Sequence, residues 1–215
     1  MIDFAAGTVQ TIAGSSCERA TVANGTMTTA KFGDILRVGL VKQGSHQVLF
    51  LGQCAQGVIR TMNLTTGVVA TLAGVFGMVD ANGVDGPAGT GLLGSNCREF
   101  IDDGNGGAYF GNNNRIRHVD ASGQLSTLAL PPATASIVGI AKEGNRLFYQ
   151  TGTTGTVFSF EVSTPTISAT EFVGVRGYRD GMSGKAEFYE SRGIEVTANE
   201  LYIIDFWNIR RVWRH

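Results

Sequence analysis

The stretch GTVQTIAG at residues 7–14 decides the fold, because the same phrase returns along the chain. It reads GVVATLAG at residues 67–74, GQLSTLAL at residues 123–130 and, more loosely, ISATEFVG at residues 167–174. The copies begin 60, 56 and 44 residues apart. A supersecondary unit that recurs at roughly this period is the signature of a solenoid or a propeller.

A second pattern lies between the copies: an apolar strand, a polar turn rich in Gly or Asn, and another strand. It reads VLFLGQCAQGVIRTM from Val48, AYFGNNNRIRHV from Ala108, RLFYQTGTTGTVFSF from Arg146 and LYIIDFWNIRRV from Leu201. This is the signal of a β-hairpin. A weaker strand precedes each hairpin, at ILRVGLVK, REFIDDG, SIVGIAK and GIEVTANE. Each unit therefore has three strands followed by a fourth that carries the first phrase, which is the blade of a β-propeller.

The two ends of the chain complement each other in this pattern. Residues 7–14 form a fourth strand with no hairpin before it, and residues 209–215 form a third strand with no fourth strand after it. An N-terminal strand that completes the last blade would remove an open edge and bury Val9 and Ile12. We therefore expect an all-β propeller, a single domain over residues 1–215, with four blades closed by this strand. The alternative is that the chain forms part of a five- or six-bladed ring.

The units resemble NHL repeats, whose pattern is GxxGxxDG, then AxF, GI, a strand ending in Asp, NxRIRxV and the first phrase. The last unit follows it closely, with GVRGYRDG at residues 174–181, AEF at residues 186–188, LYIID at residues 201–205 and NIRRV at residues 208–212. The second unit keeps NRIRHV at residues 114–119 but lacks the strand-end Asp. The resemblance implies a propeller. It leaves the function open, because the family includes enzymes, ligase-associated binding modules and extracellular receptors.

Composition limits the function classes. The chain has 215 residues with 43% hydrophobic content, enough for one full core. A net charge of −1 with 16% charged residues offers no basic excess for a nucleic acid. No run approaches the ~20 apolar residues of a membrane span.

The signals for cellular location are mixed. The start, MIDFAAGTVQ, has no signal-peptide pattern and predicts either a cytosolic protein or a leader already removed. Asn24-Gly25-Thr26 and Asn63-Leu64-Thr65 are N-glycosylation sequons, the first in a predicted accessible loop. From these signs we favour an extracellular or cell-surface location.

The three cysteines are Cys17, Cys54 and Cys97. Cys17 lies in the loop leading into the first blade and Cys54 in a hairpin turn of that blade, on the same face. A disulfide between them is geometrically feasible and would contribute about 3 to 4 kcal/mol. The alternative is three buried or inert thiols. No zinc-binding spacing is present.

Signals for catalysis and metal binding are weak. His46, His118 and His215 do not match the inner-strand histidines of the metal-using enzymes in the resembled family, and no GxSxG motif occurs. The segment VDANGVDG at residues 79–86 has calcium-ligand types but lacks the later bidentate Glu, so Asp85 is expected in a turn. We predict no catalytic residue, metal site or cofactor. The arginines that recur on the third strand are predicted to form structural ion pairs: Arg60, Arg117 and Arg210.

The candidate binding surface is the face that carries the long loops at residues 15–34, 75–96 and 175–191. Exposed aromatic side chains are the usual anchors of a protein interface or a sugar site. The predicted binding residues are Phe76, Asn112, Asn113, Tyr178, Phe206 and Trp207. We therefore expect a non-catalytic binding or scaffold module for a protein partner.

Two alternatives to a protein-binding module stay open. One is a carbohydrate-binding propeller. The other is a metal-dependent lyase- or lactonase-type enzyme, whose nearby carboxylates would be Glu99, Asp102, Asp103 and Glu195.

Overall fold

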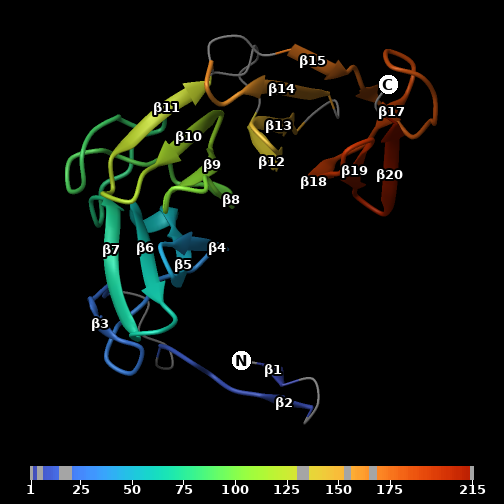
Figure 1. Cartoon of the computed structure of the whole chain (residues 1–215). Helices are drawn as coiled ribbons and strands as arrows, with labels where there is room; N and C mark the ends of the chain where they lie inside the picture. Colours follow the sequence, from blue (N-terminus) through green and yellow to red (C-terminus); the bar gives the residue numbers. More distant parts are fainter. Residues whose placement is uncertain are drawn as a thin grey trace.

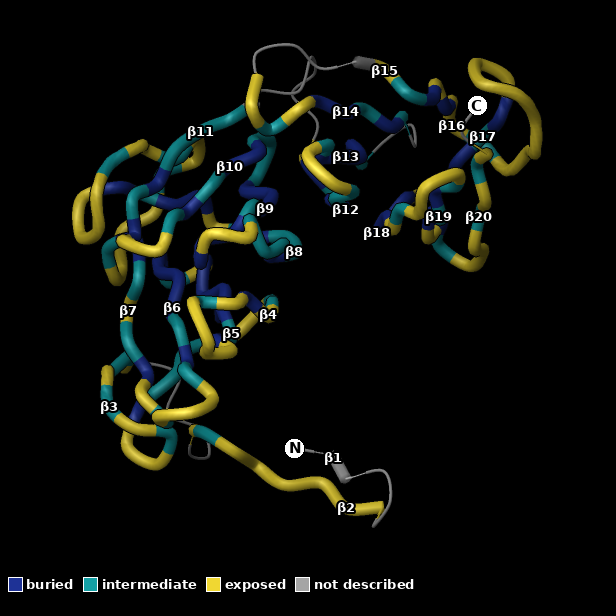
Figure 2. Tube along the Cα trace, viewed as in Figure 1, coloured by how far each residue is buried: buried dark blue, intermediate teal, exposed yellow. Residues whose placement is uncertain are grey.

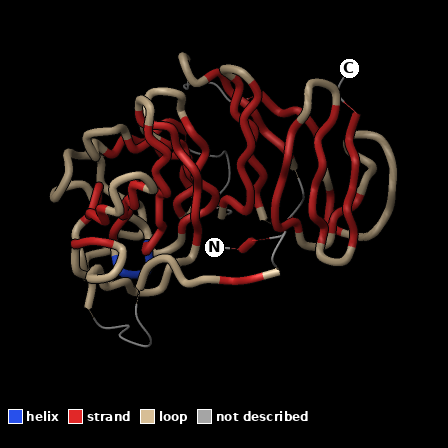
Figure 3. The backbone as a smooth tube through the Cα atoms, turned by 60° about the horizontal axis from the view of Figure 1, so that its bottom comes forward, coloured by secondary structure: helices blue, strands red, loops and turns tan. Residues whose placement is uncertain are grey.

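The computed structural model consists of antiparallel sheets that follow one another around an open arc (Figure 1). It describes residues 2–3, 7–14, 21–129, 136–152, 156–164 and 169–213. Within that part of the chain the one helical element is the 3-10 turn η1 (Cys54–Gln56). Figure 3 shows the strands of the successive sheets fanned side by side.

Four of these sheets are the blades of the propeller, and their strands follow in chain order. Blade 1 contains β4 (Arg37–Gln43), β5 (His46–Gln53), β6 (Val58–Asn63) and β7 (Val68–Gly74), with the short β3 (Gly25–Thr26) beside β7. Blade 2 contains β8 (Cys97–Asp102), β9 (Ala108–Asn112), β10 (Arg115–Val119) and β11 (Leu125–Ala129). Blade 3 contains β12 (Ile137–Glu143), β13 (Arg146–Thr151), β14 (Val157–Glu161) and β15 (Ala169–Phe172). Blade 4 contains β18 (Ser191–Val196), β19 (Glu200–Asp205) and β20 (Asn208–Trp213). The predicted all-β propeller class is thereby confirmed.

Two small sheets complete the described part of the chain. The N-terminal hairpin pairs β1 (Ile2–Asp3) with β2 (Thr8–Val9). In the loop leading into blade 4, β16 (Val175–Arg176) pairs in parallel with β17 (Glu187–Phe188).

Consecutive blades pack face to face, and these junctions hold most of the core. The inner strand β4 lies beside β8, β8 beside β12, and β12 beside β18. Figure 2 shows buried residues along the strands of each blade. The side chains at the three junctions include Phe50, Phe100 and Phe110; then Ile116, Ile140 and Tyr149; then Phe148, Val157 and Ile194. Each such side chain contributes roughly 1.5 to 3 kcal/mol by leaving water.

A glycine permits the close approach of two inner strands. A Cβ atom on Gly139 of β12 would lie 2.8 Å from the backbone nitrogen of Ile194 in β18. Because real Cβ atoms do not approach backbone so closely, any larger residue would push blades 3 and 4 apart.

A buried arginine on the third strand ties the lead-in loop to its blade. In blade 2, Arg117 donates from Nη1 to the Leu92 carbonyl at 2.6 Å and from Nη2 to the Val84 carbonyl at 2.9 Å. Its Nη2 also pairs with Asp85 at 3.0 Å. Asp85 further accepts hydrogen bonds from the backbone nitrogen and hydroxyl of Thr127 on β11. The predicted structural role of Arg117 is confirmed, and Asp85 links this loop to the fourth strand.

The same arrangement recurs in blade 1 with an amide in place of the carboxylate. Arg60 donates from Nη2 to the Ala23 carbonyl at 2.7 Å and to Asn24 Oδ1 at 3.1 Å. The hydroxyl of Thr71 also donates to Asn24 Oδ1, at 3.1 Å. Asn24 therefore has a structural role through its Oδ1, while the residue itself remains exposed, as expected for the loop that carries this sequon. In blade 3 the corresponding position is Phe158, which pairs with Thr170 as Arg117 pairs with Thr127.

A disulfide joins blade 1 to blade 2. Cys54 in η1 is bonded to Cys97 at the start of β8, with their Cα atoms 5.8 Å apart. The prediction that Cys54 pairs with Cys17 is therefore wrong. The hairpin turn of blade 1 meets the inner strand of the next blade, which brings Cys97 within bonding distance. Cys17 itself lies outside the described residues.

The predicted closure of the ring within one chain is not formed. The strand β2 pairs with β1, and β20 is the edge strand of a three-stranded sheet in the described part of the chain. Figure 1 places β20 at one end of the arc and β2 below the other end. Val9 and Ile12, predicted to be buried against the last blade, are exposed. Figure 1 shows blades 1 and 4 at the two ends of the open arc.

We predict that the disulfide connects two defined tryptic fragments. Digestion under non-reducing conditions should give residues 43–60 linked to residues 61–98, which mass spectrometry will identify. Replacing Cys54 and Cys97 by Ala should lower the free energy of unfolding by about 3 to 4 kcal/mol, because the open chain regains loop entropy. A fragment of residues 1–19 linked to residues 43–60 would show that Cys17 is the partner instead.

Asp85 should make the stability of blade 2 depend on pH. Partial burial alone raises its pKa, but the hydrogen bonds from Thr127 and the Arg117 cation bring the pKa below the usual value. Its contribution is thus present above about pH 4, where an unfolded Asp ionises, and is lost as pH falls through the lower folded value. We expect Asp85→Asn to lower the melting temperature at pH 7, and this deficit to shrink on acidification below about pH 4.

The matched control for this test is Asp80→Asn. Asp80 lies in the same loop and accepts from the backbone of Asn82 at 2.9 Å. It should leave the melting temperature nearly unchanged at both pH values. Equal deficits for the two variants, or a deficit of Asp85→Asn that does not depend on pH, would contradict the assigned role of Asp85.

Candidate functional site

Four aromatic side chains gather at the loop end of blade 4: Tyr178, Tyr189, Phe206 and Trp207, which we call the aromatic cluster. The ring centroids of Tyr178 and Tyr189 lie 4.7 Å apart in a stacked arrangement. Those of Phe206 and Trp207 lie 4.1 Å apart, edge to face, and Tyr189 touches both. Trp207 is 76% exposed and Tyr178 is 52% exposed. The cluster therefore presents large apolar rings to solvent.

Two arginines flank the aromatic cluster. The guanidinium carbon of Arg176 lies 5.9 Å from the ring centroid of Tyr189, and that of Arg192 lies 4.8 Å from Phe206. Both distances suit a cation–π interaction. Arg192 also pairs with the Glu190 carboxylate at 3.0 Å. The surface thus combines flat apolar rings with positive charge.

The hairpin turn between β19 and β20 holds Phe206 in an uncommon conformation. Its φ is +51°, in the left-handed region, which costs a bulky residue on the order of 1 kcal/mol. The backbone nitrogen of Phe206 donates to the Glu190 carbonyl at 3.1 Å. Asn113 occupies the equivalent turn position in blade 2, with φ of +53°. A turn that favours Gly or Asn therefore carries Phe here, and strain of this kind is concentrated at functional sites.

A buried carboxylate, that of Asp205, positions Tyr189 of the aromatic cluster. Asp205, at the end of β19, accepts from the backbone nitrogens of Tyr189 and Glu190 at 2.9 and 3.0 Å. It also lies 3.4 Å from Arg210, which was predicted to form a structural ion pair. Because Asp205 is fully buried, these bonds hold Tyr189 against the hairpin turn.

A second set of bonds fixes the loop that carries Tyr178. The carboxylate of Glu187 accepts from the backbone nitrogen of Tyr178 at 3.1 Å and pairs with Arg179 at 2.9 Å. Arg210 donates to the Arg179 carbonyl at 3.0 Å and pairs with Asp180 at 2.6 Å. The loop is therefore tied both to itself and to β20.

The structure brings together three of the six predicted binding residues. Tyr178, Phe206 and Trp207 are all members of the aromatic cluster. Phe76 is exposed, but it lies in the loop after β7, at the other end of the arc from blade 4.

The two predicted asparagines have structural contacts instead. Asn112 is buried: its Oδ1 accepts from the Gly94 nitrogen at 2.8 Å, and its Nδ2 donates to the carbonyls of Gly94 and Asn96. Asn113 donates to the Ala81 carbonyl at 2.9 Å. Asn112 in blade 2 thus holds the backbone of the lead-in loop, as Asp205 does in blade 4. Both predicted asparagines use their side chains to hold backbone and do not form part of an exposed binding surface.

Sequence reasoning missed Tyr189, Arg176 and Arg192. Tyr189 follows Phe188, whose side chain is buried. Since successive side chains in extended backbone point to opposite sides, the stretch AEFYE already placed Tyr189 outward. The two arginines carry no motif, and only the folded loop brings them to the rings.

The carboxylates considered for an enzyme do not converge. Asp103 pairs with Nε2 of His118 at 2.7 Å, and Asp102 accepts from the Lys42 backbone nitrogen at 3.0 Å. Glu195 is exposed on β18, while burial raises the pKa of Glu99 on β8. Among the described residues, no group of three or more His, Cys, Asp or Glu side chains is arranged to hold a metal ion.

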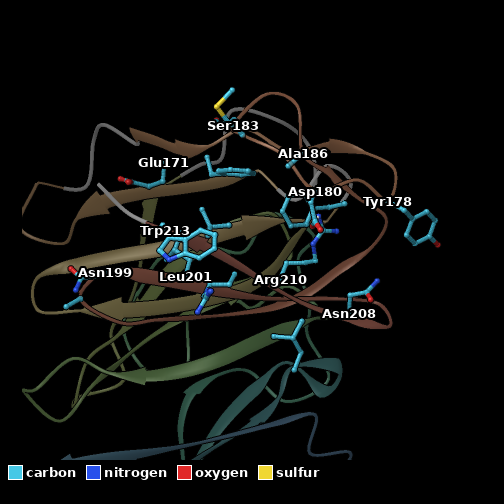
Figure 4. Close-up of a pocket in the computed structure, with 18 of the residues that line it drawn as sticks. Glu171, Tyr178, Asp180, Ser183, Ala186, Asn199, Leu201, Asn208, Arg210 and Trp213 are labelled. Atoms are coloured by element: carbon cyan, nitrogen blue, oxygen red, sulfur yellow. The ribbon is translucent and has the colours of Figure 1, made fainter.

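A groove of about 1240 Å³ runs along the outer edge of blade 4. Its walls include Glu171 of β15, Asp180 of the lead-in loop, and Arg210 and Trp213 of β20 (Figure 4). Tyr178 of the aromatic cluster also lines the groove, at the end where the lead-in loop lies (Figure 4). The groove and the aromatic cluster thus meet at Tyr178.

Comparison with known proteins supports the fold. No protein-family model and no curated protein matches the sequence. Among solved structures, an auxiliary nutrient binding protein from Bacteroides thetaiotaomicron aligns over 94% of this chain and 44% of its own, with 16% identity and a TM-score of 0.61. Virginiamycin B lyase from Staphylococcus aureus aligns over 82% of this chain and 51% of its own, with 14% identity and a TM-score of 0.55. The computationally designed Ika4 protein aligns over 94% of this chain and 100% of its own, with 13% identity and a TM-score of 0.54.

The chain spans about half the length of the lyase and nutrient-binding structures that it resembles. In the described residues, no helix is both long and apolar enough to cross a membrane. At these low identities the likeness concerns the fold alone, and with the four packed sheets it establishes a β-propeller architecture for this chain.

Proposed function

We propose that the chain is an NHL-type propeller module, one domain over residues 1–215, that binds a protein partner through the aromatic cluster. The observation that carries this proposal is the exposed stack of Tyr178, Tyr189 and Trp207 with arginines at its border. Tyr, Trp and Arg are the residue types that dominate binding energy at protein interfaces. The proposed setting is extracellular or at the cell surface, as the sequence analysis favoured.

The backbone of the aromatic cluster is fixed by hydrogen bonds, which supports a role in binding. Asp205 and Glu187 fix the backbone of Tyr189 and Tyr178, and Phe206 sits in a rigid two-residue turn. Association with a partner then costs little ordering entropy in these residues. The partner surface that suits it has an apolar side chain for the rings and a carboxylate for Arg176 or Arg192.

A neutral glycan is the second candidate ligand. The flat indole of Trp207 is exposed beside other rings, which is the geometry on which a sugar stacks. The two candidates differ in their need for charge. Arg192→Gln should weaken a carboxylate-bearing protein partner and leave a neutral glycan unaffected, and a glycan array tests the sugar directly.

We predict that Trp207→Ala weakens partner binding about 30-fold or more, the effect of losing one interface hot spot. The measurement is the affinity of the partner identified by cross-linking on the cell surface, compared between the natural chain and the variant. The melting temperature should not change, because the side chain is exposed.

Phe76→Ala is the matched control. Phe76 is also an exposed aromatic residue in a long loop, but it lies outside the aromatic cluster. Its replacement should leave the affinity unchanged. If Trp207→Ala binds as well as the natural chain, or if Phe76→Ala weakens binding equally, the aromatic cluster is not the binding surface.

A further inference from the structure

In the part of the chain that the structure describes, the sheet of blade 4 has three strands and ends at β20. In blades 1, 2 and 3 the third strand pairs with β7, β11 and β15, whereas β20 ends its sheet in the described part of the chain. The groove of about 1240 Å³ lies along this edge, between β20 and the loop that carries Asp180. Its place corresponds to the missing strand (Figure 4). An open edge of this kind is a template for pairing with another segment.

Residues 7–14 share the two terminal glycine conformations of a fourth strand, and within them Thr8–Val9 form β2. Gly7 and Gly67 begin the phrase with φ of +64° and +72°, and Gly14 and Gly74 end it with φ of +88° and +87°. Yet Val9 is 79% exposed, whereas its equivalent in β7, Val69, is 1% exposed. The segment thus has the glycine conformations and the apolar side chain of β7, but its β2 pairs with the short β1 and not with the third strand of a blade.

The register of the other blades defines how the segment fits. Arg60 faces Thr71 in blade 1, and Arg117 faces Thr127 in blade 2. The same register sets Arg210 opposite Thr11. Val212, which packs against the core between blades 3 and 4, then lies opposite Val9.

Asp180 offers a specific contact for this strand. In blade 2 the carboxylate of Asp85 holds both Arg117 and Thr127. In blade 4 Asp180 holds Arg210, and its side chain stays 96% exposed. A strand in the predicted register would bring the hydroxyl of Thr11 to this carboxylate.

Blades 1 and 4 each have one face that no other blade covers in the described structure. These two faces carry the residue types that pack together at the three junctions between blades. On the third strand, one apolar residue directly precedes Arg60 in blade 1, Arg117 in blade 2 and Phe158 in blade 3. These three residues are buried against the following blade: Ile59, Ile116 and Val157. Their equivalent in blade 4, Ile209, is 78% exposed. On the inner strands Phe100, Ile140 and Ile194 are buried against the preceding blade, whereas their equivalent in blade 1, Val38, is 57% exposed.

These two faces stand at opposite ends of the arc, so one molecule does not join them (Figure 1). We propose that two copies of this chain associate head to tail. Each copy packs its Ile209 face on the Val38 face of the other, and inserts residues 7–14 beside β20 of the other. In this chain the fourth strand of one blade leads directly into the loop of the next blade. When blade 1 of the second copy packs on blade 4 of the first, the N-terminal strand of the second copy is therefore brought beside β20 of the first. The result is a closed ring with both edges covered.

The first test measures mass in solution by light scattering after gel filtration. The unsubstituted chain of residues 1–215 should have twice the 22.8 kDa mass of one copy. Ile209→Asp and Val38→Lys should each be folded monomers, with dimerisation at least 100-fold weaker. Their equimolar mixture should form dimers, because that pair contains one natural junction and one with Asp facing Lys. Val68→Asp, which alters an exposed valine on β7 away from both faces, should stay dimeric.

The second test examines the strand exchange by cross-linking, with Cys17 replaced by Ser. The register sets residue 10 opposite residue 211, so Gln10→Cys together with Arg211→Cys should form a disulfide between copies, seen as a band at twice the chain mass on a non-reducing gel. A natural chain of 22.8 kDa in solution, an Ile209→Asp variant that still dimerises, or a cross-link within one copy would each overturn the proposal. The last outcome would show that the N-terminal strand closes its own chain.

Discussion

The face-to-face packing of consecutive blades is the interaction on which the rest of this structure depends. A single blade is a small sheet with two apolar faces, and it can bury both of them only between two neighbours. Blade 3 buries both faces in this way: Phe148 and Val157 pack on one side, and Tyr149 packs on the other. The disulfide between Cys54 and Cys97 strengthens the first junction. At the ends of the arc the same requirement is left open.

The loops depend on the blades through a few buried polar groups. Arg60, Arg117 and Arg210 project from the third strand into the loop that leads into their own blade. Blade 3 carries Phe158 at this position. In blade 4 this tether and the buried Asp205 together hold the rings of the aromatic cluster in one arrangement. A rigid sheet thus supplies a pre-ordered surface, which is the property that a binding site needs.

The sequence predicted the strands, the blades and the structural arginines, because these follow from alternation and repetition along the chain. It also predicted that Tyr178, Phe206 and Trp207 lie on one face. It did not predict that Asn112 is buried, since an Asn after a strand looks the same whether it meets solvent or backbone. The partner of Cys54 and the open arc depend on how whole blades pack against each other, which no local pattern in the sequence encodes.

The open arc of four blades is tested most directly by distances between spin labels in one molecule. Labels attached to Cys at positions 45 and 199 report on the inner hairpin turns of blades 1 and 4, and labels at positions 45 and 105 report on blades 1 and 2. Cys17 is replaced by Ser, and each labelled protein is diluted in unlabelled protein so that only pairs within one copy are measured. We predict that the 45–199 distance is clearly longer than the 45–105 distance. Equal distances would mean that one chain closes a ring of four blades, which would contradict this account.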